Sequence, residues 1–308
     1  MDKLKVGVIG VGHLGSIHAK IYKDLPNCSL IGVCDIDRSR LETVSKELDV
    51  PGYPDFRQLL DKVEAVSVTT PTKLHYQVAS CFLEHKIHSL VEKPFTLTLK
   101  EADGLIEIAQ KNDLILQVGH IERFNSAFSA TQKIIKEPKF IECHRLSPFP
   151  NRSLDVGVVL DIMIHDIDIV LGLVDSEIER IESVGVNVLT KFEDIANVRL
   201  TFKNGCVANL TASRVSDEVM RKIRIFQKDT YISLDYKNAE ASVYKREAFK
   251  ISKKNLPIEK EQPLQKELES FINCVINHQT PLVSGIVARE ALAVALEIQN
   301  QIWRKKIS

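Results

Sequence analysis

The chain has 308 residues, more than one hydrophobic core usually supports, so two domains are expected. Its hydrophobic content of 44% and charged content of 27% are those of an ordinary soluble globular protein. Lysine plus arginine and aspartate plus glutamate number 41 each, which favours neither nucleic acid nor an anionic membrane as a partner. No apolar run is long enough to span a bilayer.

The cysteines and the first residues bear on the cellular compartment. The six cysteines form no C-x-x-C pair and no regular framework, and most lie in apolar segments: Cys28, Cys34, Cys81, Cys143, Cys206 and Cys274. Buried free thiols are therefore expected, which indicates a reducing environment. Met1 leads almost directly into an apolar strand rather than a signal peptide, so we predict a cytoplasmic protein.

Strand-like and helix-like patterns alternate up to about residue 122. Short, continuously apolar runs predict strands at Lys5–Ile9, Ser29–Cys34, Ala65–Thr69, His88–Val91 and Ile115–Val118. Apolar residues at i, i+3 and i+4 predict helices at Leu14–Lys23, Ser39–Leu48, Phe56–Leu60, His75–His85 and Lys100–Asn112. Continuously apolar strands suit a parallel sheet covered on both faces, so residues 1–122 are predicted to form a doubly wound α/β domain of the Rossmann type.

The first strand runs directly into the motif G-x-G-x-x-G, and a helical pattern follows. In such a motif Gly10 permits the tight turn, Gly12 lets the backbone approach a pyrophosphate, and Gly15 lets helix and strand pack closely. The helix N-terminus at His13 and Leu14 then offers free N–H groups to phosphates. Ordinary turn glycines are the alternative, but the strand before and the helix after favour a dinucleotide site.

Asp35 lies 20 residues after Gly15, at the end of the second predicted strand. A carboxylate there accepts hydrogen bonds from a ribose diol and repels a 2′-phosphate, so NAD is predicted as the cofactor. Arg38 and Arg40 lie close enough to keep NADP as the less favoured cofactor.

Residues 123–308 have a different pattern, with longer alternating runs typical of an antiparallel sheet. The expected strands are Phe140–Ser147, Ile181–Leu189, Ala196–Phe202, Cys206–Ser213, Lys222–Gln227, Tyr231–Tyr236 and Ala241–Lys245. Helices are expected at Val156–Val174, Leu264–His278 and Gly285–Trp303, and a hairpin turn at Asn204-Gly205. Lys253–Gln265 is expected to be an exposed connection. This segment is predicted to be an α+β domain with a large, mostly antiparallel sheet, serving substrate binding and oligomerisation.

Glu92-Lys93-Pro94 stands at the end of the fourth predicted strand. Ligands bind beyond the carboxyl ends of parallel strands, so Lys93 is expected to project into the crevice that holds the dinucleotide. The alternative is a charged strand end that a proline terminates.

Asp161, His165 and Asp168 are spaced to share one stripe of an otherwise apolar helix. Polar groups on such a helix are costly to bury unless they pair or serve a ligand. A solvent-exposed stripe is one alternative and a metal site is another. We expect no metal, because a nicotinamide enzyme with a lysine available needs no Lewis acid.

Taken in order, these motifs resemble the Gfo/Idh/MocA oxidoreductases, which include glucose–fructose oxidoreductase and inositol dehydrogenase. The likeness spans nearly the whole chain, through the glycine motif, Thr70-Pro71-Thr72 with His75, E-K-P, and D-x-x-x-H at residues 161–165. One departure is that the glycine cluster usual before D-x-x-x-H is reduced to Gly157.

The resemblance implies an enzyme with catalytic Lys93, Asp161 and His165. It also implies that Thr70, Pro71, His75 and Glu92 contribute to the cofactor site. The roles are chemically reasonable, since a histidine can take a hydroxyl proton at neutral pH and a lysine can stabilise a developing alkoxide. Asp161 would fix the imidazole tautomer.

Two segments, Val118–Asn125 and His144–Arg152, resemble the branch of the family that oxidises the 3-hydroxyl of a UDP-linked N-acetyl sugar. Arg123, Arg145 and Arg152 could then bind the diphosphate, because guanidinium groups match phosphate geometry. The alternative is that these arginines are salt-bridge partners.

Other functions remain open on the sequence alone. The enzyme could act on a free polyol, a dihydrodiol or a tetrapyrrole, or the chain could be a non-catalytic NAD-binding regulator. The retention of all three catalytic residues argues against the regulator. Val184–Leu189 and Ala208–Ala212 suggest that neither face of the antiparallel sheet is strongly polar, which predicts a homodimer or a homotetramer.

Overall fold

A computed structural model describes residues 3–149, 156–248, 250–259 and 261–307 of the chain. Its contacts define two compact units. Unit 1 comprises the chain up to His120 together with Gln262–Arg289, and unit 2 comprises Ile121–Glu261 together with the chain from Glu290. Within the described ranges, none of the helices is both long enough and apolar enough to cross a membrane.

Unit 1 is built on a six-stranded sheet with the order β3-β2-β1-β4-β5-β6, and every neighbouring pair is parallel. The strands are β1 (Leu4–Ile9), β2 (Cys28–Cys34), β3 (Gly52–Tyr53), β4 (Ala65–Val68), β5 (His88–Glu92) and β6 (Leu116–Gly119). The predicted doubly wound parallel sheet is thereby confirmed. The short strand β3 was not expected.

The helices of unit 1 fill the connections between these strands. They are α1 (His13–Asp24), α2 (Arg38–Leu48), α3 (His75–Glu84), α4 (Leu99–Lys111) and α7 (Pro263–Asn277), with 3-10 turns η1 (Phe56–Leu59) and η2 (Thr72–Leu74). Helix α1 contacts α2 and α7, whereas α3 contacts α4. Right-handed crossovers in opposite directions from β1 place these two groups on opposite faces of the sheet.

The segment Gln262–Arg289 packs on unit 1 although it lies far away in the sequence. The side chain of Gln117 donates to the carbonyl of Glu267, and the backbone N–H of Val118 donates to the carbonyl of Val283 at 3.0 Å. Unit 1 is therefore discontinuous in sequence, whereas the expected division at residue 122 was into two consecutive segments.

The order of the strands determines where ligands can bind in unit 1. Strands β1 and β4 are neighbours, and the connections from their carboxyl ends lead away in opposite directions. Such a switch point leaves a crevice at the carboxyl edge of the sheet. Gly10, Asp35, Thr69 and Lys93 directly follow β1, β2, β4 and β5, so they lie along this edge.

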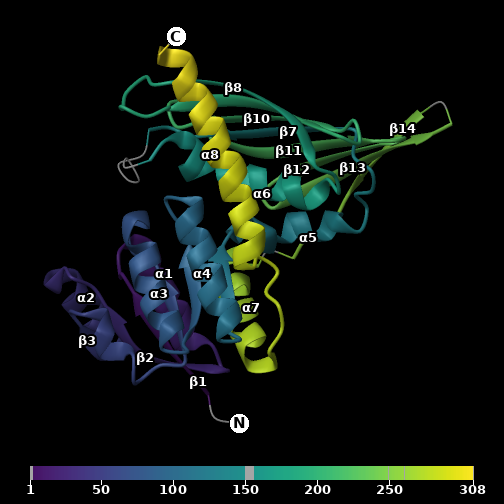
Figure 1. Ribbon diagram of the computed structural model, residues 1–308. Coiled ribbons are helices and arrows are strands. Elements are labelled where there is room, and N and C mark those ends of the chain that lie inside the picture. Colours follow the sequence, from purple (N-terminus) through teal and green to yellow (C-terminus); the bar gives the residue numbers. More distant parts are fainter. Residues whose placement is uncertain (1–2, 150–155, 249, 260, 308) are drawn as a thin grey trace. The chain divides into compact units, whose positions relative to one another are not determined.

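Unit 2 contains an eight-stranded sheet with the order β14-β13-β12-β11-β7-β10-β9-β8 (Figure 1). The strands are β7 (Phe140–Leu146), β8 (Ile178–Val186), β9 (Ile195–Phe202), β10 (Val207–Ser213), β11 (Met220–Gln227), β12 (Thr230–Asp235), β13 (Glu240–Glu247) and β14 (Lys250–Asn255). Only the pairing of β7 with β10 is parallel, so the prediction of a mostly antiparallel sheet is confirmed.

Two local predictions for unit 2 had different outcomes. Gly205 has a φ of +80° in the turn between β9 and β10, as the Asn204-Gly205 signal predicted. The exposed connection expected at Lys253–Gln265 begins later than predicted, because Lys250–Asn255 pairs with β13 as an edge strand. Its lysines resemble the charged residues that keep edge strands from pairing further.

The helices of unit 2 are η3 (Ile121–Phe124), α5 (Ser126–Gln132) and α6 (Ile164–Leu173), with a π-helical turn η4 (Val159–Met163) directly before α6. Helix α8 (Gly285–Ile307) begins in unit 1 and continues into unit 2. Helices α5 and α6 lie on one face of the eight-stranded sheet (Figure 1). The helix expected at Val156–Val174 thus begins with a π turn, and such turns are frequent at functional sites.

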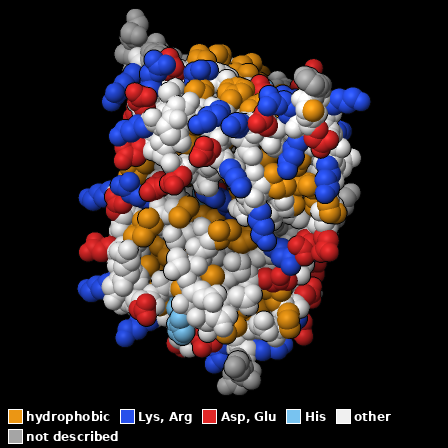
Figure 2. Space-filling view, turned by 90° about the vertical axis from the view of Figure 1, so that its right-hand side faces the viewer, with side chains coloured by type: hydrophobic (Ala, Val, Ile, Leu, Met, Phe, Trp, Pro, Cys, Tyr) orange, Lys and Arg blue, Asp and Glu red, His pale blue; other side chains and the backbone are white. Residues whose placement is uncertain are grey.

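The opposite face of this sheet is more polar than expected. Ala208, Leu210 and Ala212 are buried, whereas the alternate residues Asn209 and Thr211 of β10 are only partly buried. Their side chains accept hydrogen bonds from the side chains of Arg199 and Asn197 on β9, respectively. The sequence-based view that neither face of Ala208–Ala212 is strongly polar is therefore wrong. Charges of both signs are also interspersed over the surface shown in Figure 2.

Candidate active site

The glycine loop after β1 adopts a conformation that other residues cannot easily take. Gly10 has a φ of +91°, and a Cβ there would lie 2.9 Å from the backbone nitrogen of Thr70. A Cβ on Gly15 would overlap the carbonyl oxygen of Gly10. At Gly12 a Cβ would meet only the tip of the Arg40 side chain, at 3.4 Å. The loop is therefore tightly packed at Gly10 and Gly15, whereas space remains beside Gly12.

The start of α1 offers unpaired donors above this loop. Gly12 precedes the helix, and no side chain caps the first N–H groups. His13 is exposed and Leu14 is half-buried in the first turn. Thr70 follows β4 and lies close to Gly10 in space, and its buried hydroxyl oxygen has no hydrogen-bond partner in the described part of the structure. Free N–H groups, the helix dipole and an orphaned hydroxyl together fit a phosphate-bearing cofactor.

Asp35 ties the end of β2 to the glycine loop. One carboxylate oxygen accepts the N–H of Val11 at 3.0 Å and the other accepts the N–H of Asp37 at 2.9 Å. Because each oxygen has two lone pairs, both can still accept a ribose hydroxyl. Arg40 lies 3.7 Å from Asp35 and 3.2 Å from Asp37, so two carboxylates balance its charge. This pairing disfavours Arg40 as a free partner for a 2′-phosphate.

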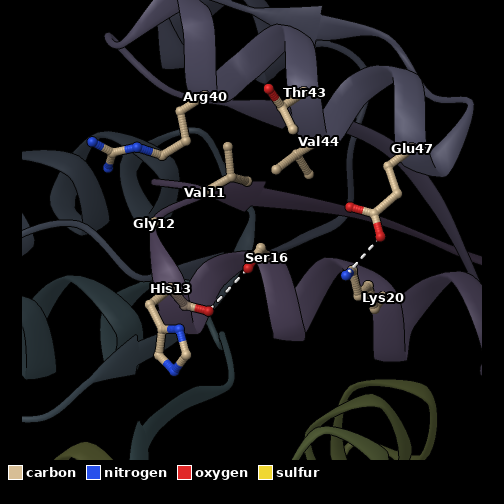
Figure 3. A pocket seen from close by; sticks show the side chains of 9 residues that line it. All are labelled: Val11, Gly12, His13, Ser16, Lys20, Arg40, Thr43, Val44 and Glu47. Carbon is tan, nitrogen blue, oxygen red and sulfur yellow. Dashed lines mark hydrogen bonds and ion pairs between the residues drawn. The ribbon is translucent and has the colours of Figure 1, made fainter.

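A pocket of about 360 Å³ lies between α1 and α2 (Figure 3). The residues that line it are Val11, Gly12, His13, Ser16, Lys20, Arg40, Thr43, Val44 and Glu47. Figure 3 shows Gly12, His13 and Arg40 at one end and the Lys20–Glu47 ion pair, 2.7 Å long, at the other. The pocket thus opens beside the glycine loop that is expected to hold the cofactor.

His75 connects two loops at the carboxyl edge of the sheet. Its Nε2 lies 2.8 Å from the carbonyl oxygen of Thr70, and its Nδ1 lies 2.9 Å from that of Pro94. Burial lowers the pKa of His75, although its carbonyl contacts oppose that shift. Pro71, which starts the turn η2, is exposed. His75 therefore holds the loop after β4 against the segment that follows Lys93.

Lys93 follows β5 and is half-buried, and its bond to Pro94 is cis. The neighbouring Glu92 points into unit 1, where one carboxylate oxygen lies 3.2 Å from the Nε2 of His18. A Cβ on Gly119 of β6 would approach the Glu92 carboxylate within 2.8 Å, so Glu92 is closely packed. Glu92 had been expected to contribute to the cofactor site, and its observed partners are protein groups. His18 was missed by the sequence analysis.

Asp161 and His165 lie on consecutive turns in unit 2, Asp161 in the π turn and His165 in the first turn of α6, and both are half-buried. Glu193 supports the start of this segment, because its carbonyl accepts the N–H of Val158 at 2.9 Å. A Cβ on Gly157 would overlap the Glu193 carboxylate. The retained glycine of this loop is therefore required by a buried carboxylate that the sequence did not indicate.

Asp168 pairs with Arg123, whose Nε lies 2.6 Å from its carboxylate. Arg145 lies 2.8 Å from Asp166 and 2.7 Å from Glu122. Two of the three arginines expected at a diphosphate are thus in buried ion pairs. This arrangement agrees with the alternative that these arginines are salt-bridge partners. The third, Arg152, lies outside the described residues.

Titratable side chains elsewhere do not suggest a metal centre. Within the described ranges, no three histidine, cysteine, aspartate or glutamate side chains are grouped so that they could hold a metal ion. All six cysteines are free, and five of them are buried.

Comparisons with known proteins agree with this geometry. Residues 4–120 match a family described as "Oxidoreductase family, NAD-binding Rossmann fold", and residues 119–231 match the "GFO/IDH/MocA C-terminal domain". A UDP-N-acetylglucosamine 3-dehydrogenase of Acidithiobacillus ferrooxidans is 39% identical, and the match covers 97% of each chain. A solved structure of the enzyme with this name and organism superposes with a TM-score of 0.93 over 97% of each chain. A myo-inositol 2-dehydrogenase of Thermotoga maritima is 28% identical over 98% of this chain and 97% of its own.

Both matched segments together cover most of the chain, and they contain the glycine loop, Asp35 and the D-x-x-x-H helix. The predicted family, the NAD cofactor and the assignment as an enzyme are thereby confirmed. The chain belongs to the GFO/IDH/MocA family of NAD-binding oxidoreductases, which act on CH–OH groups.

Proposed function

We propose that this oxidoreductase oxidises the 3-hydroxyl of a UDP-linked N-acetyl sugar, with UDP-N-acetylglucosamine as the first candidate. The observation that carries the proposal is the 39% identity to a UDP-N-acetylglucosamine 3-dehydrogenase along 97% of both chains. The retention of Lys93, Asp161 and His165 supports an active enzyme rather than a non-catalytic regulator.

The cofactor would be held at the carboxyl edge of the sheet in unit 1. The N–H groups at His13 and Leu14 would bind the pyrophosphate, and Asp35 would accept the ribose hydroxyls. Ile36, 86% exposed directly after Asp35, offers an apolar surface for the adenine, which the sequence analysis missed. When bound, NAD supplies the nicotinamide carbon that accepts the hydride.

Three side chains of the protein would handle the proton of the sugar hydroxyl and the negative charge that develops on its oxygen. His165 would remove the proton of the sugar hydroxyl, since imidazole titrates near neutral pH. Lys93 would stabilise the negative charge that develops on that oxygen. Asp161, one turn before His165, would orient the imidazole and support its protonated form. In the reverse direction the same groups would protonate a ketone.

A free polyol is the second candidate substrate, because a myo-inositol 2-dehydrogenase matches the chain over nearly its whole length. The test is NADH formation, followed by absorbance, with UDP-N-acetylglucosamine and myo-inositol measured side by side. A higher kcat/KM for the nucleotide sugar supports the proposal, and a higher kcat/KM for inositol overturns it. His165→Ala serves as the inactive control for both substrates.

We also propose a homodimer, or a tetramer of such dimers, working in the reducing cytoplasm. Two valines on the edge strand β8 are exposed to solvent, Val184 by 58% and Val186 by 50%. On the same sheet Phe226, Tyr231 and Tyr244 stack with ring centroids 4.7 and 4.8 Å apart. Partly apolar sheet surfaces of this kind favour association, and free cysteines suit a reducing compartment.

A further inference from the structure

Two buried arginines form ion pairs with aspartates of α6, the helix that carries His165. From η3, Arg123 donates through Nε to one Asp168 carboxylate oxygen at 2.6 Å and through Nη2 to the other at 3.0 Å. Its Nη2 also donates to the backbone carbonyl of Asp168 at 2.8 Å. From β7, Arg145 donates to both carboxylate oxygens of Asp166, at 3.1 and 2.8 Å. Each arginine therefore forms a two-pronged, charge-assisted contact with α6.

Both contacts are buried within unit 2, where the two arginines and their aspartates are each at most 8% exposed. Arg145 also binds Glu122 at 2.7 Å, so its charge faces two carboxylates. Removing one member of such a buried pair leaves an uncompensated charge, which is far more costly than losing a surface pair. These arginines cannot leave their partners for a ligand without that penalty.

Gly172 shows how closely Arg123 fits against the helix. It lies one turn after Asp168, and a Cβ there would overlap the guanidinium group of Arg123. The helix thus lacks a side chain at the one place where the guanidinium must cross its surface. This fit fixes the position of α6 along η3 as well as its rotation.

The positions of the two aspartates around the helix explain what the contacts achieve. Successive residues of an α-helix are about 100° apart, so Asp166 lies about 100° to one side of His165 and Asp168 about 60° to the other. The helix is therefore anchored on both sides of His165. Rotation in either direction would stretch one of the two arginine contacts.

We propose that Arg123 and Arg145 are positioning residues that fix the rotation of α6 and thereby place His165 for proton transfer. This inference rests on the proposed function of His165 as the base. It replaces the expectation that these two arginines bind the substrate diphosphate.

The test uses Arg123→Lys and Arg145→Lys in the full chain, each of which keeps the charge but loses the two-pronged contact. We expect kcat to fall about tenfold to a hundredfold, because small misplacements of a catalytic group have effects of this size. KM for UDP-N-acetylglucosamine and the calorimetric Kd values for UDP and NAD should stay unchanged. The matched control is Arg224→Lys, whose partner Glu142 lies 2.8 Å away in a partly exposed pair on the same sheet.

Gly172→Ala provides a second variant if the lysine variants do not fold. It retains every charge but pushes against the Arg123 guanidinium, so the same loss of kcat is expected. Activity is expressed per NADH-binding site, which removes the effect of any unfolded fraction. A merely structural role would lower the folded fraction and leave this specific activity intact.

Several outcomes would overturn the inference. One is a higher KM and weaker UDP binding at unchanged kcat, which would assign the arginines to the diphosphate. Another is an unchanged kcat per site in the three variants. Failure of the proposed function is a separate result, because His165→Ala would then remain active. If myo-inositol proves to be the better substrate, the same variants are compared with it.

Discussion

The Nε2 atom of His18 lies 3.2 Å from a carboxylate oxygen of Glu92, and both side chains are buried in unit 1. This contact joins the helix after the glycine loop to the residue before Lys93. Burial by itself would raise the pKa of Glu92, but the hydrogen bond and charge of His18, with the charge of Lys93, hold it below its usual value. Glu92 therefore stays ionised, and its second oxygen accepts the N–H of Lys93 at 3.2 Å.

Replacing His18 with leucine should destabilise the protein by about 3 kcal/mol, because Glu92 would remain as an unpaired buried charge. Adding Glu92→Gln should recover part of this loss by removing the charge. Urea unfolding at neutral pH measures both effects, with the exposed His85→Leu as control. Equal stability of His18→Leu and the unaltered protein would show that the contact contributes nothing.

The unaltered protein should bind NAD more tightly than NADP, because Asp35 can accept ribose hydroxyls and repels a 2′-phosphate. Asp35→Ser should reduce this preference by about tenfold or more, which corresponds to ~1.4 kcal/mol. Calorimetric titration of both dinucleotides gives the ratio, and the exposed Asp61→Ser is the control. Tighter binding of NADP by the unaltered protein would contradict the role of Asp35.

Lys93→Ala and His165→Ala should each lower kcat by roughly two to four powers of ten, because each removes a group that we propose to act on the reacting oxygen. NAD binding should remain nearly intact, which fluorescence titration with NADH can check. Asp161→Asn should cost less if its task is to orient His165. Near-normal turnover in the Lys93 and His165 variants would exclude both from the mechanism.

Asp194 should make the stability of unit 2 depend on pH. It lies 2.9 Å from the Nε of the fully buried Arg214. Burial acts to raise its pKa, but the N–H groups of Thr190 and Leu189, the Thr190 hydroxyl and Arg214 lower it well below the usual value. A lowered pKa in the folded state stabilises the protein at pH values above the unfolded pKa of about 4, and this contribution is lost as pH falls through the folded value.

We therefore expect Asp194→Asn to lose about 3–5 kcal/mol at pH 7, as when one member of a buried ion pair is removed. The difference from the unaltered protein should shrink as the pH falls below about 4. Urea unfolding at several pH values tests this, with the exposed Asp217→Asn as control. A difference that does not change with pH would argue against an ionised Asp194.

Light scattering at micromolar concentration should give at least twice the chain mass of 34.7 kDa. Val184→Lys should shift the protein toward the monomer, because a charge on the exposed apolar part of β8 opposes association. Ile276→Lys, on the exposed side of α7, is the control and should leave the mass unchanged. A stable monomer of the unaltered protein would refute the proposed assembly.

The sequence by itself determined the features that depend on local spacing. Hydrophobic periodicity is a property of neighbouring residues, so it predicted the parallel strands of unit 1 and the mostly antiparallel sheet of unit 2. The glycine spacing likewise predicted a tight turn at Gly10 and close packing at Gly15, and the structure leaves no room for a Cβ at either position. Asp35 was identified because it directly follows the second predicted strand, and the carboxyl ends of parallel strands lie at the same edge of the sheet as the glycine loop.

The tertiary structure alone decided which distant residues meet. Arg123 and Asp168 are 45 positions apart, and no local pattern shows that they form a buried pair instead of serving a ligand. The Glu193 carboxylate that excludes a side chain at Gly157, and the partnership of His18 with Glu92, were equally invisible. Such contacts arise when separate elements pack into one core, where a charged group must find a partner because water is absent.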